Sequence, residues 1–303
     1  MRLPNFFIIG APKSGTTALY DTIKQHPDIY MSPIKEPRFF IFEGEPKAAS
    51  GPASGHFRRT SVWKPLDYAL LFAGVKQQRA IGEASPIYLR TPLAAKRIRK
   101  NMPQSRIIAV LRQPAERAYS NYTFLSQHHV EPARTFEEAI AHEETRIQEG
   151  WLSWFHSKQG GYYHAQLSVY YDLFPREQIR IYLYEDWRDD PRSMLRDLFG
   201  FLEVDENFIP EIKRSNVTRL SKNIRFHGWA MHPERLDRRA PFLPLIARRA
   251  VMFALRRIDS TFNLTPPPPL DPDIRARLTA DYRGDILKLQ DLIGRDLSHW
   301  LKT

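Results

Sequence analysis

Short apolar segments separated by helical patterns constrain the fold of this 303-residue sequence more than any other feature. The clearest segments read "FFIIG", "RIIAVL" and "IRIYLY", and each is apolar along nearly its whole length. Strands that are covered on both faces have this pattern, whereas a strand with one wet face alternates polar and apolar residues. Such segments alternating with helices predict an α/β fold with a central, mostly parallel β-sheet flanked by helices.

The boundaries of the expected strands and helices follow from the same pattern. Pro92 and Pro114 stand at a favoured first position of a helix, and Pro27 closes the helix after the first strand. The expected strands are Asn5–Gly10, Ile29–Ser32, Arg79–Glu83, Arg106–Leu111 and Gln178–Tyr184. The expected helices are Thr16–His26, Pro92–Asn101, Pro114–Ser126 and a last one within 271–303, where apolar residues repeat at three and four positions.

The chain shows no internal repeat, and we expect residues 1–303 to form a single domain. Within it we distinguish a core over 1–210, a basic loop and helix region over 211–270 and a C-terminal helix over 271–303. Pro46–Phe57 is rich in Pro, Gly and Ser and is expected to be a loop. Thr265–Pro272 is expected to be a stiff linker into the last helix.

The cysteine content and the N-terminus indicate where the protein functions. With no cysteine, disulfides and thiolate metal sites are excluded, which suits a reducing compartment. No window of about 18 apolar residues predicts a membrane-spanning helix. The first four residues run directly into the first strand and leave no room for a signal peptide. We therefore expect a cytoplasmic protein.

The positive charge is concentrated in one part of the chain. Lys and Arg number 45 against 34 Asp and Glu, and 12 of these cations but only two acids lie between Lys213 and Arg257. This basic stretch indicates an anionic partner, although a solvated surface would look the same. Within it, Leu243–Ile258 is a candidate basic amphipathic helix, for which packing on the core is favoured over peripheral contact with a membrane.

The segment "FFIIGAPKSGTTAL" predicts a phosphate-binding loop after the first strand. Gly10 and Gly15 keep the spacing of the loop G-x-x-x-x-G-K-[ST], but Thr16 stands where its lysine belongs and Lys13 lies inside the loop. A strand, a short turn and a helix direct free backbone N–H groups at one point, where an anion binds. The strand "RIIAVL" leads into Arg112 rather than into an acid that would hold magnesium. A donor that leaves as a nucleotide monophosphate, without a metal, suits this arrangement.

Two signatures in the expected order resemble those of sulfotransferases that use 3′-phosphoadenosine 5′-phosphosulfate (PAPS). "GAPKSGTTAL" resembles the loop that binds the 5′-phosphosulfate, and "LRQPAERAYSNY" resembles the signature that holds the 3′-phosphate. Weaker likenesses follow in "SPIKEPRFF", "IGEASPIYL", "GGYYHAQL" and "LIGRDLSHW", so the resemblance spans most of the chain. The form of these segments is most similar to the heparan-type and bacterial carbohydrate sulfotransferases.

This resemblance implies which residues bind the nucleotide. The 5′-phosphosulfate is assigned to Lys13, Ser14, Gly15, Thr16 and Thr17, and the 3′-phosphate to Arg112 and Ser120. Weaker matches near the nucleotide are Gly161, Tyr163 and Gln166, together with Arg219 and Lys222 in a loop that would close over the 3′-phosphate. Arg112 is also supported by its position, because ligands of open α/β sheets bind where strands end.

The resemblance also implies the roles in catalysis. Lys13 would stabilise the charge that develops on the leaving phosphate, and Glu36 in "IKEPRFF" would be the base that deprotonates the acceptor. Pro37 restricts the Glu36 backbone to an extended or turn conformation. Glu83 is a second candidate acid with a possible structural role, and His128 and His129 are expected on an exposed loop.

The expected reaction is transfer of a sulfuryl group from PAPS to a hydroxyl or amine of a glycan, a glycolipid or a small acceptor, releasing 3′-phosphoadenosine 5′-phosphate (PAP). Some heparan-type relatives carry a lysine where this chain has Ala84, so the acceptor stays open. Two other classes also stay open: an atypical kinase with a phosphate loop, and a noncatalytic polyanion binder. We expect no nucleic-acid partner and no metal.

Overall fold

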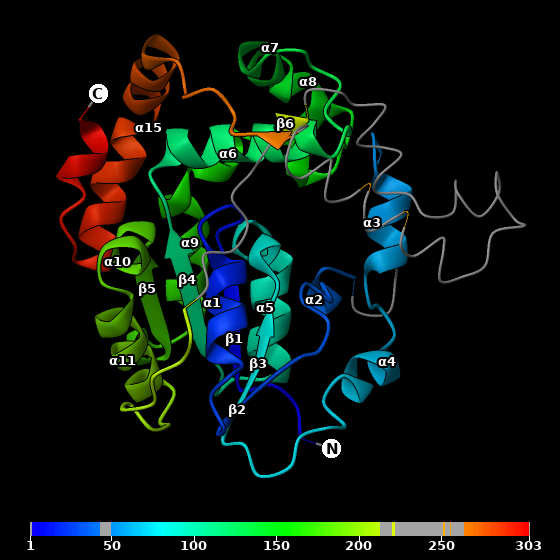
Figure 1. Ribbon diagram of the computed structural model, residues 1–303, viewed down its shortest axis with the longest axis vertical. Coiled ribbons are helices and arrows are strands. Elements are labelled where there is room, and N and C mark those ends of the chain that lie inside the picture. The colour runs from blue at the N-terminus through cyan, green and yellow to red at the C-terminus, as the bar shows by residue number, and fades with distance from the viewer. Residues whose placement is uncertain are drawn as a thin grey trace, which may run out of the picture.

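Five parallel strands form the central sheet of the protein in a computed structural model (Figure 1). The structure describes residues 2–42, 50–212, 220–221, 251, 255 and 264–302. The strands of the sheet are β1 (Phe6–Gly10), β2 (Ile29–Met31), β3 (Ala80–Ala84), β4 (Arg106–Leu111) and β5 (Ile179–Leu183). A separate antiparallel pair consists of β6 (Leu220–Ser221) and β7 (Leu264–Thr265).

The strand order β2-β3-β1-β4-β5 places β1 at the centre of the sheet. Phe6 pairs with Gly82 of β3 on one side and with Arg106 of β4 on the other. Because all five strands are parallel, their carboxyl ends lie at one edge of the sheet. In open α/β sheets this edge is where ligands bind.

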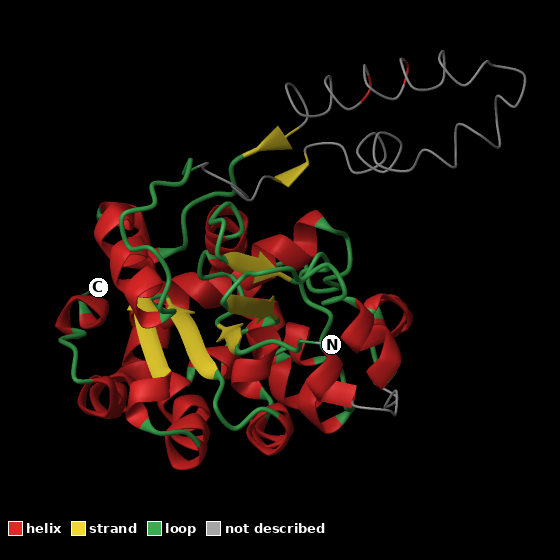
Figure 2. Ribbon diagram, turned by 90° about the horizontal axis from the view of Figure 1, so that it is seen from below, coloured by secondary structure: helices red, strands yellow, loops and turns green. Residues whose placement is uncertain are grey.

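Alternate side chains of β1 enter two different hydrophobic clusters, one on each face of the sheet. Phe7 and Ile9 belong to the larger cluster, together with residues of α5, α6, α9 and α15. Phe6 and Ile8 belong to the smaller cluster, with residues of α1 and α11. Figure 2 shows the resulting sheet between layers of helices. Burial on both faces explains why the strands read as continuous apolar segments.

Helices connect the strands and cover both faces. The α-helices are α1 (Thr16–Ile23), α2 (Phe39–Phe42), α3 (Ser54–Thr60), α4 (Pro65–Leu70), α5 (Pro92–Asn101), α6 (Pro114–Gln127), α7 (Phe136–Ala141), α8 (Glu143–Gln148), α9 (Tyr163–Leu173), α10 (Tyr184–Asp189), α11 (Pro191–Phe201) and α15 (Pro272–Ile293). The 3₁₀ turns are η1 (Pro86–Arg90), η2 (Ser153–Phe155), η3 (Gln159–Gly161), η4 (Arg176–Gln178) and η6 (Ser298–Leu301). The last long helix, α15, packs against α6 and α9 and so joins the main domain.

The α/β fold with a parallel sheet is therefore confirmed, and the five expected strands agree with the observed ones to within about a residue at each end. The expected loop over Pro46–Phe57 is wrong at its end, because α3 begins at Ser54. Phe57 gives this polar segment an apolar anchor, since its ring meets the Trp154 ring edge-on at 4.9 Å. Residues 266–271, within the expected linker Thr265–Pro272, form neither helix nor strand.

Candidate active site

The carboxyl edge of the sheet gathers the segments that the sequence singled out. The phosphate loop follows β1, and Arg112 follows the adjacent β4. On the other side of β1, Ser85 follows β3. The turn that carries Glu36 reaches the same place, because the Glu36 N–H donates to the carbonyl oxygen of Ala84 at 2.9 Å. Residues far apart in the sequence thus meet around the end of β1.

The phosphate loop ends at a helix whose first turn is suited to an anion. Gly15 precedes α1 with φ at 89°, a left-handed backbone that a residue with a Cβ adopts only at a cost. Within the described part of the chain, no side chain caps this helix and its first turn holds no acid. The first backbone N–H groups of α1 are therefore free to donate to a ligand, and the helix dipole favours negative charge there. Thr16 and Thr17 open the helix at this point.

Lys13 extends from the middle of the phosphate loop to the C-terminal half of α6. Its Nζ lies 4.0 Å from the centre of the Phe124 ring, a cation–π contact. Burial and the positive charge of Arg112 lower the pKa of Lys13 to about 8, while the nearby Glu36 carboxylate opposes this shift. The predicted Lys13, Arg112 and Glu36 are thus close enough to influence one another. A cation that is held here without a full counter-charge is ready for an anionic ligand.

Arg112 is held at the end of β4 by its backbone and by its side chain. Its carbonyl oxygen accepts a hydrogen bond from the Tyr163 hydroxyl at 2.9 Å. Its guanidinium lies 5.0 Å from the centre of the Tyr184 ring and 3.6 Å from a carboxylate oxygen of Glu116. Glu116 also pairs with Arg275 of α15 at 3.2 Å, so two arginines share one acid. The positive charge of Arg112 is therefore only partly neutralised, which suits a phosphate.

The other residues with predicted contacts to the nucleotide have different surroundings. Ser120 lies half-buried on α6, the helix that follows Arg112 in the chain. Tyr163 is fully buried, and its hydroxyl supports the backbone of Arg112. A Cβ on Gly161 would lie 2.8 Å from the Tyr282 ring, so this glycine is required for packing against α15. Gln166 donates to the carbonyl oxygen of Gln159.

Glu36 lies beside a lysine in a turn with an unusual backbone. The Lys35 Nζ is 2.8 Å from a carboxylate oxygen of Glu36, and both side chains are partly exposed. The φ of Glu36 is 62°, in the left-handed region rather than in the extended region that precedes most prolines. This left-handed backbone is not what the restriction by Pro37 led us to expect. Partial exposure leaves the carboxylate of Glu36 accessible to an acceptor.

Glu83, the second candidate acid, is fully buried within β3. One carboxylate oxygen accepts a hydrogen bond from the Tyr68 hydroxyl at 2.5 Å, and the other accepts one from the Ser85 hydroxyl at 2.6 Å. Burial raises the pKa of Glu83 to about 7 despite these hydrogen bonds. Glu83 therefore contacts protein groups on both oxygens and has a structural role.

Sequence reasoning missed several residues that shape the site. Phe124 and Tyr184 supply the rings that face the two predicted cations. Arg38, which is 7% exposed, is buried against the rings of Phe57 and Trp154. Their partners lie far away in the sequence, so no local pattern could have identified them. The expected exposure of His128 and His129 is observed.

Other predicted features lie outside the described residues. These are Arg219, Lys222 and nearly all of 243–258, of which only Val251 and Leu255 are described. Among the described helices, none is long and apolar enough to cross a membrane. In the same part of the chain, no three His, Asp or Glu side chains are grouped as metal ligands would be.

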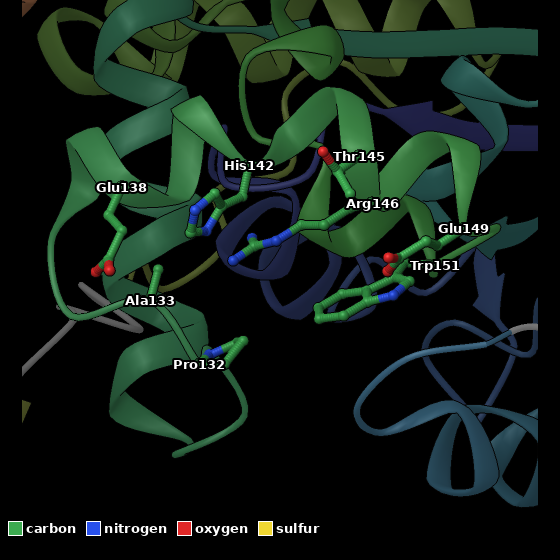
Figure 3. A pocket seen from close by; sticks show the side chains of 8 residues that line it. All are labelled: Pro132, Ala133, Glu138, His142, Thr145, Arg146, Glu149 and Trp151. Carbon is green, nitrogen blue, oxygen red and sulfur yellow. The ribbon is translucent and has the colours of Figure 1, made fainter.

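A cavity of about 280 Å³ lies apart from these residues, beside α7 and α8 (Figure 3). The ring of Trp151 and the side chains of Glu138 and His142 border it. The Arg146 side chain in its wall is fixed by Glu131, at 2.7 Å, and both are almost completely buried. None of the predicted site residues lines this cavity.

Comparisons with known proteins show the family and the fold of this chain. The family model described as "Sulfotransferase domain" matches residues 3–228. The crystal structure of a sulfotransferase from Alicyclobacillus acidocaldarius is 31% identical with a TM-score of 0.78, and each chain is covered completely. A sulfotransferase domain from the curacin biosynthetic pathway, 16% identical with a TM-score of 0.50, shares the fold over 93% of this chain.

Curated relatives include much longer proteins. The human bifunctional heparan sulfate N-deacetylase/N-sulfotransferase 3 is 26% identical over 99% of this chain, which spans only 31% of that protein. The membrane-associated sulfotransferase kil1 of Dictyostelium discoideum is 24% identical over 72% of this chain and 59% of its own length. The matched family model covers both nucleotide signatures and most of the chain, which confirms the resemblance. This chain belongs to the sulfotransferase family, whose enzymes take PAPS and release PAP.

Proposed function

We propose that this chain transfers the sulfuryl group of PAPS to a hydroxyl or an amine of an acceptor. The observation that carries this proposal is the meeting of Lys13, Arg112 and Glu36 at the free N-terminus of α1. Two cations and a set of backbone N–H groups fit a nucleotide that is anionic at both its 5′ and 3′ positions. An accessible carboxylate beside them supplies a base.

The proposed reaction is a direct displacement at sulfur. The acceptor oxygen or nitrogen forms a bond to sulfur while the bond from sulfur to the 5′-phosphate oxygen breaks. Glu36 takes the proton of the acceptor, and protonated Lys13 stabilises the negative charge that builds on the departing oxygen. Since the pKa of Lys13 is about 8, this lysine is mostly protonated at neutral pH even before the donor binds. Arg112 and Ser120 hold the 3′-phosphate.

A carbohydrate or glycolipid is the acceptor class that we propose. The support is the likeness to the human heparan sulfate N-deacetylase/N-sulfotransferase. The absence of cysteine supports a cytoplasmic location. For residues 243–258, packing on the core is favoured, and peripheral contact with an acidic membrane surface is the alternative. Cell fractionation and sedimentation with anionic liposomes test these two points.

Incubation with labelled PAPS and a panel of acceptors tests the activity. The panel contains neutral and amino-sugar oligosaccharides, a glycolipid, a tyrosine peptide and small phenols. We expect at least one acceptor to gain a single sulfuryl group by mass spectrometry, with release of PAP and no requirement for a divalent metal. If wild-type protein binds PAP and sulfates none of these acceptors, the proposed acceptor classes are wrong. If it does not bind PAP either, the proposed function fails.

A further inference from the structure

The turn that carries Glu36 has a backbone that its own residues do not favour. Glu36 and Arg38 have φ values of 62° and 58°, both in the left-handed region, and Pro37 lies between them. A left-handed backbone strains a residue that carries a Cβ. Such a conformation persists where the surrounding structure holds it in place.

Two backbone N–H groups attach this turn to the end of β3. The Glu36 N–H donates to the carbonyl oxygen of Ala84 at 2.9 Å. The Arg38 N–H donates to the hydroxyl oxygen of Ser85 at 3.1 Å. Ser85 is fully buried, so water does not reach this place. The Ser85 hydroxyl therefore supplies the hydrogen-bond acceptor that the Arg38 N–H requires. The hydroxyl is thus one of the two groups at the end of β3 that anchor the turn.

Glu83 determines which way the Ser85 hydroxyl points. A serine hydroxyl has one proton to donate, and its lone pairs accept. Ser85 donates this proton to a carboxylate oxygen of Glu83 at 2.6 Å, which leaves its oxygen free to accept from Arg38. The other carboxylate oxygen of Glu83 accepts from Tyr68 at 2.5 Å, so the carboxylate itself is fixed.

The Arg38 side chain holds the same turn from the opposite side. Its Nε donates to the carbonyl oxygen of Glu36 at 2.8 Å, and its Nη2 donates to the Thr60 hydroxyl at 3.2 Å. Its guanidinium lies over the rings of Phe57 and Trp154, at 4.6 and 5.6 Å from their centres. The backbone of Glu36 is therefore fixed both by β3 and by α3.

We propose that Glu83 and Ser85 are positioning residues that act through the backbone of Arg38 to keep the Glu36 carboxylate in place at the carboxyl edge of the sheet. This inference rests on the proposed function, in which Glu36 is the base. Neither residue touches the reacting atoms, because both are fully buried. Glu83 and Ser85 contribute by fixing the position of Glu36, the proposed base.

A double-mutant cycle distinguishes positioning from general support of the fold. Ser85→Ala removes the acceptor for the Arg38 N–H, and we expect it to lower kcat by about ten- to a hundredfold, since small displacements of a catalytic group have effects of this size. In a Glu36→Gln background the same change should alter kcat less than about twofold, because the two residues act as one unit. KM for PAPS and affinity for PAP should not change. Ser105→Ala, at a buried serine away from the turn, is the matched control.

Glu83 offers a matched pair of variants. Glu83→Gln keeps an oxygen that can accept the Ser85 hydroxyl, so it should retain most of the activity that Glu83→Ala loses. Equal losses for both variants would overturn the orienting role of Glu83.

Hydrogen exchange measures how firmly the Arg38 N–H is held, and it needs no sulfate-accepting substrate. Ser85→Ala should speed exchange in the peptide that contains Arg38 and leave exchange in the phosphate loop unchanged. Unchanged exchange at Arg38, or an equal loss of kcat with and without Glu36, would overturn the inference. A wild-type protein that sulfates no acceptor and does not bind PAP either would instead overturn the proposed function, and with it the role given to Glu36.

Discussion

Single residues determine the chemistry of this site, and the most informative of them is Lys13. Its position inside the phosphate loop was visible in the sequence, as were Arg112 at a strand end and Glu36 before a proline. Their convergence was expected only from the resemblance, and in the structure the segments that carry them lie at the carboxyl edge of the sheet. Arg38 could not be predicted, because its role depends on aromatic rings that are distant in the sequence.

Removing Lys13 or Glu36 should nearly abolish sulfuryl transfer. Lys13→Ala removes the charge that stabilises the leaving oxygen, a loss of about a hundred- to a thousandfold in kcat. Glu36→Gln removes the base and keeps the size of the side chain. Both proteins should unfold at the same denaturant concentration as wild type. Near-normal turnover by Glu36→Gln would show that the base is a different residue.

The pH dependence of PAP binding should report on Lys13. The pKa of Lys13 without ligand is about 8, and a bound phosphate favours the protonated form and raises this pKa. Affinity for PAP should therefore be highest below pH 8 and fall as the pH rises above it. Calorimetric titrations between about pH 7 and 9.5 measure this, and Lys13→Met should bind more weakly with a flatter profile. An equally steep fall in Lys13→Met would assign the effect to another group.

At the scale of the element, the phosphate loop and its helix depend on Gly15. The strand, loop and helix were predicted because glycine spacing and apolar segments are local signals. The short helices α7 and α8 were not predicted, because they carry too few residues for a clear repeat. The turn around Glu36 was only partly predicted, since Ser85 and Glu83 hold it from another strand.

Gly15→Ala should destabilise the protein and weaken its binding of PAP. The Cβ would meet Tyr184 at an ordinary contact distance of 3.4 Å, so the cost comes from the φ of 89°. We expect a loss of about 1 to 2 kcal/mol in the free energy of unfolding. Gly284→Ala in α15 is the control, because no heavy atom lies within 4 Å of its Cβ. That change should stabilise the helix by up to about 1 kcal/mol. Similar effects of both changes on stability would contradict the conformational argument.

The buried Glu83 in β3 should make stability depend on pH. Its pKa is about 7 in the native protein against 4.5 in the unfolded chain. Between these values the native state keeps a proton that the unfolded chain releases, so the free energy of unfolding decreases as the pH rises from 4.5 and levels off above 7. The total decrease is of the order of 3 kcal/mol. Denaturant unfolding at several pH values measures it, and in Glu83→Gln the decrease should be smaller by this amount.

At the scale of the whole molecule, the candidate site lies at one edge of the sheet. The segments that form it come from most of the described chain. The α/β class was predictable because burial on both faces leaves continuous apolar segments in the sequence. The strand order was not predictable from those segments, since it is decided by how the connecting helices pack on the two faces.

Binding of PAP should stabilise the whole domain without a metal. A ligand at about 100 times its Kd adds about 2.7 kcal/mol to the free energy of unfolding. We therefore expect PAP to raise Tm in the presence of a chelator, and ATP with magnesium to have a much smaller effect. Stronger stabilisation by ATP and magnesium would favour a kinase.

A crystal structure with bound PAP tests the central claim most directly. The account predicts the 5′-phosphate at the first turn of α1, with the Lys13 Nζ within hydrogen-bonding distance of its oxygens and the 3′-phosphate against Arg112. A nucleotide bound with its 5′-phosphate away from Lys13 would contradict the account.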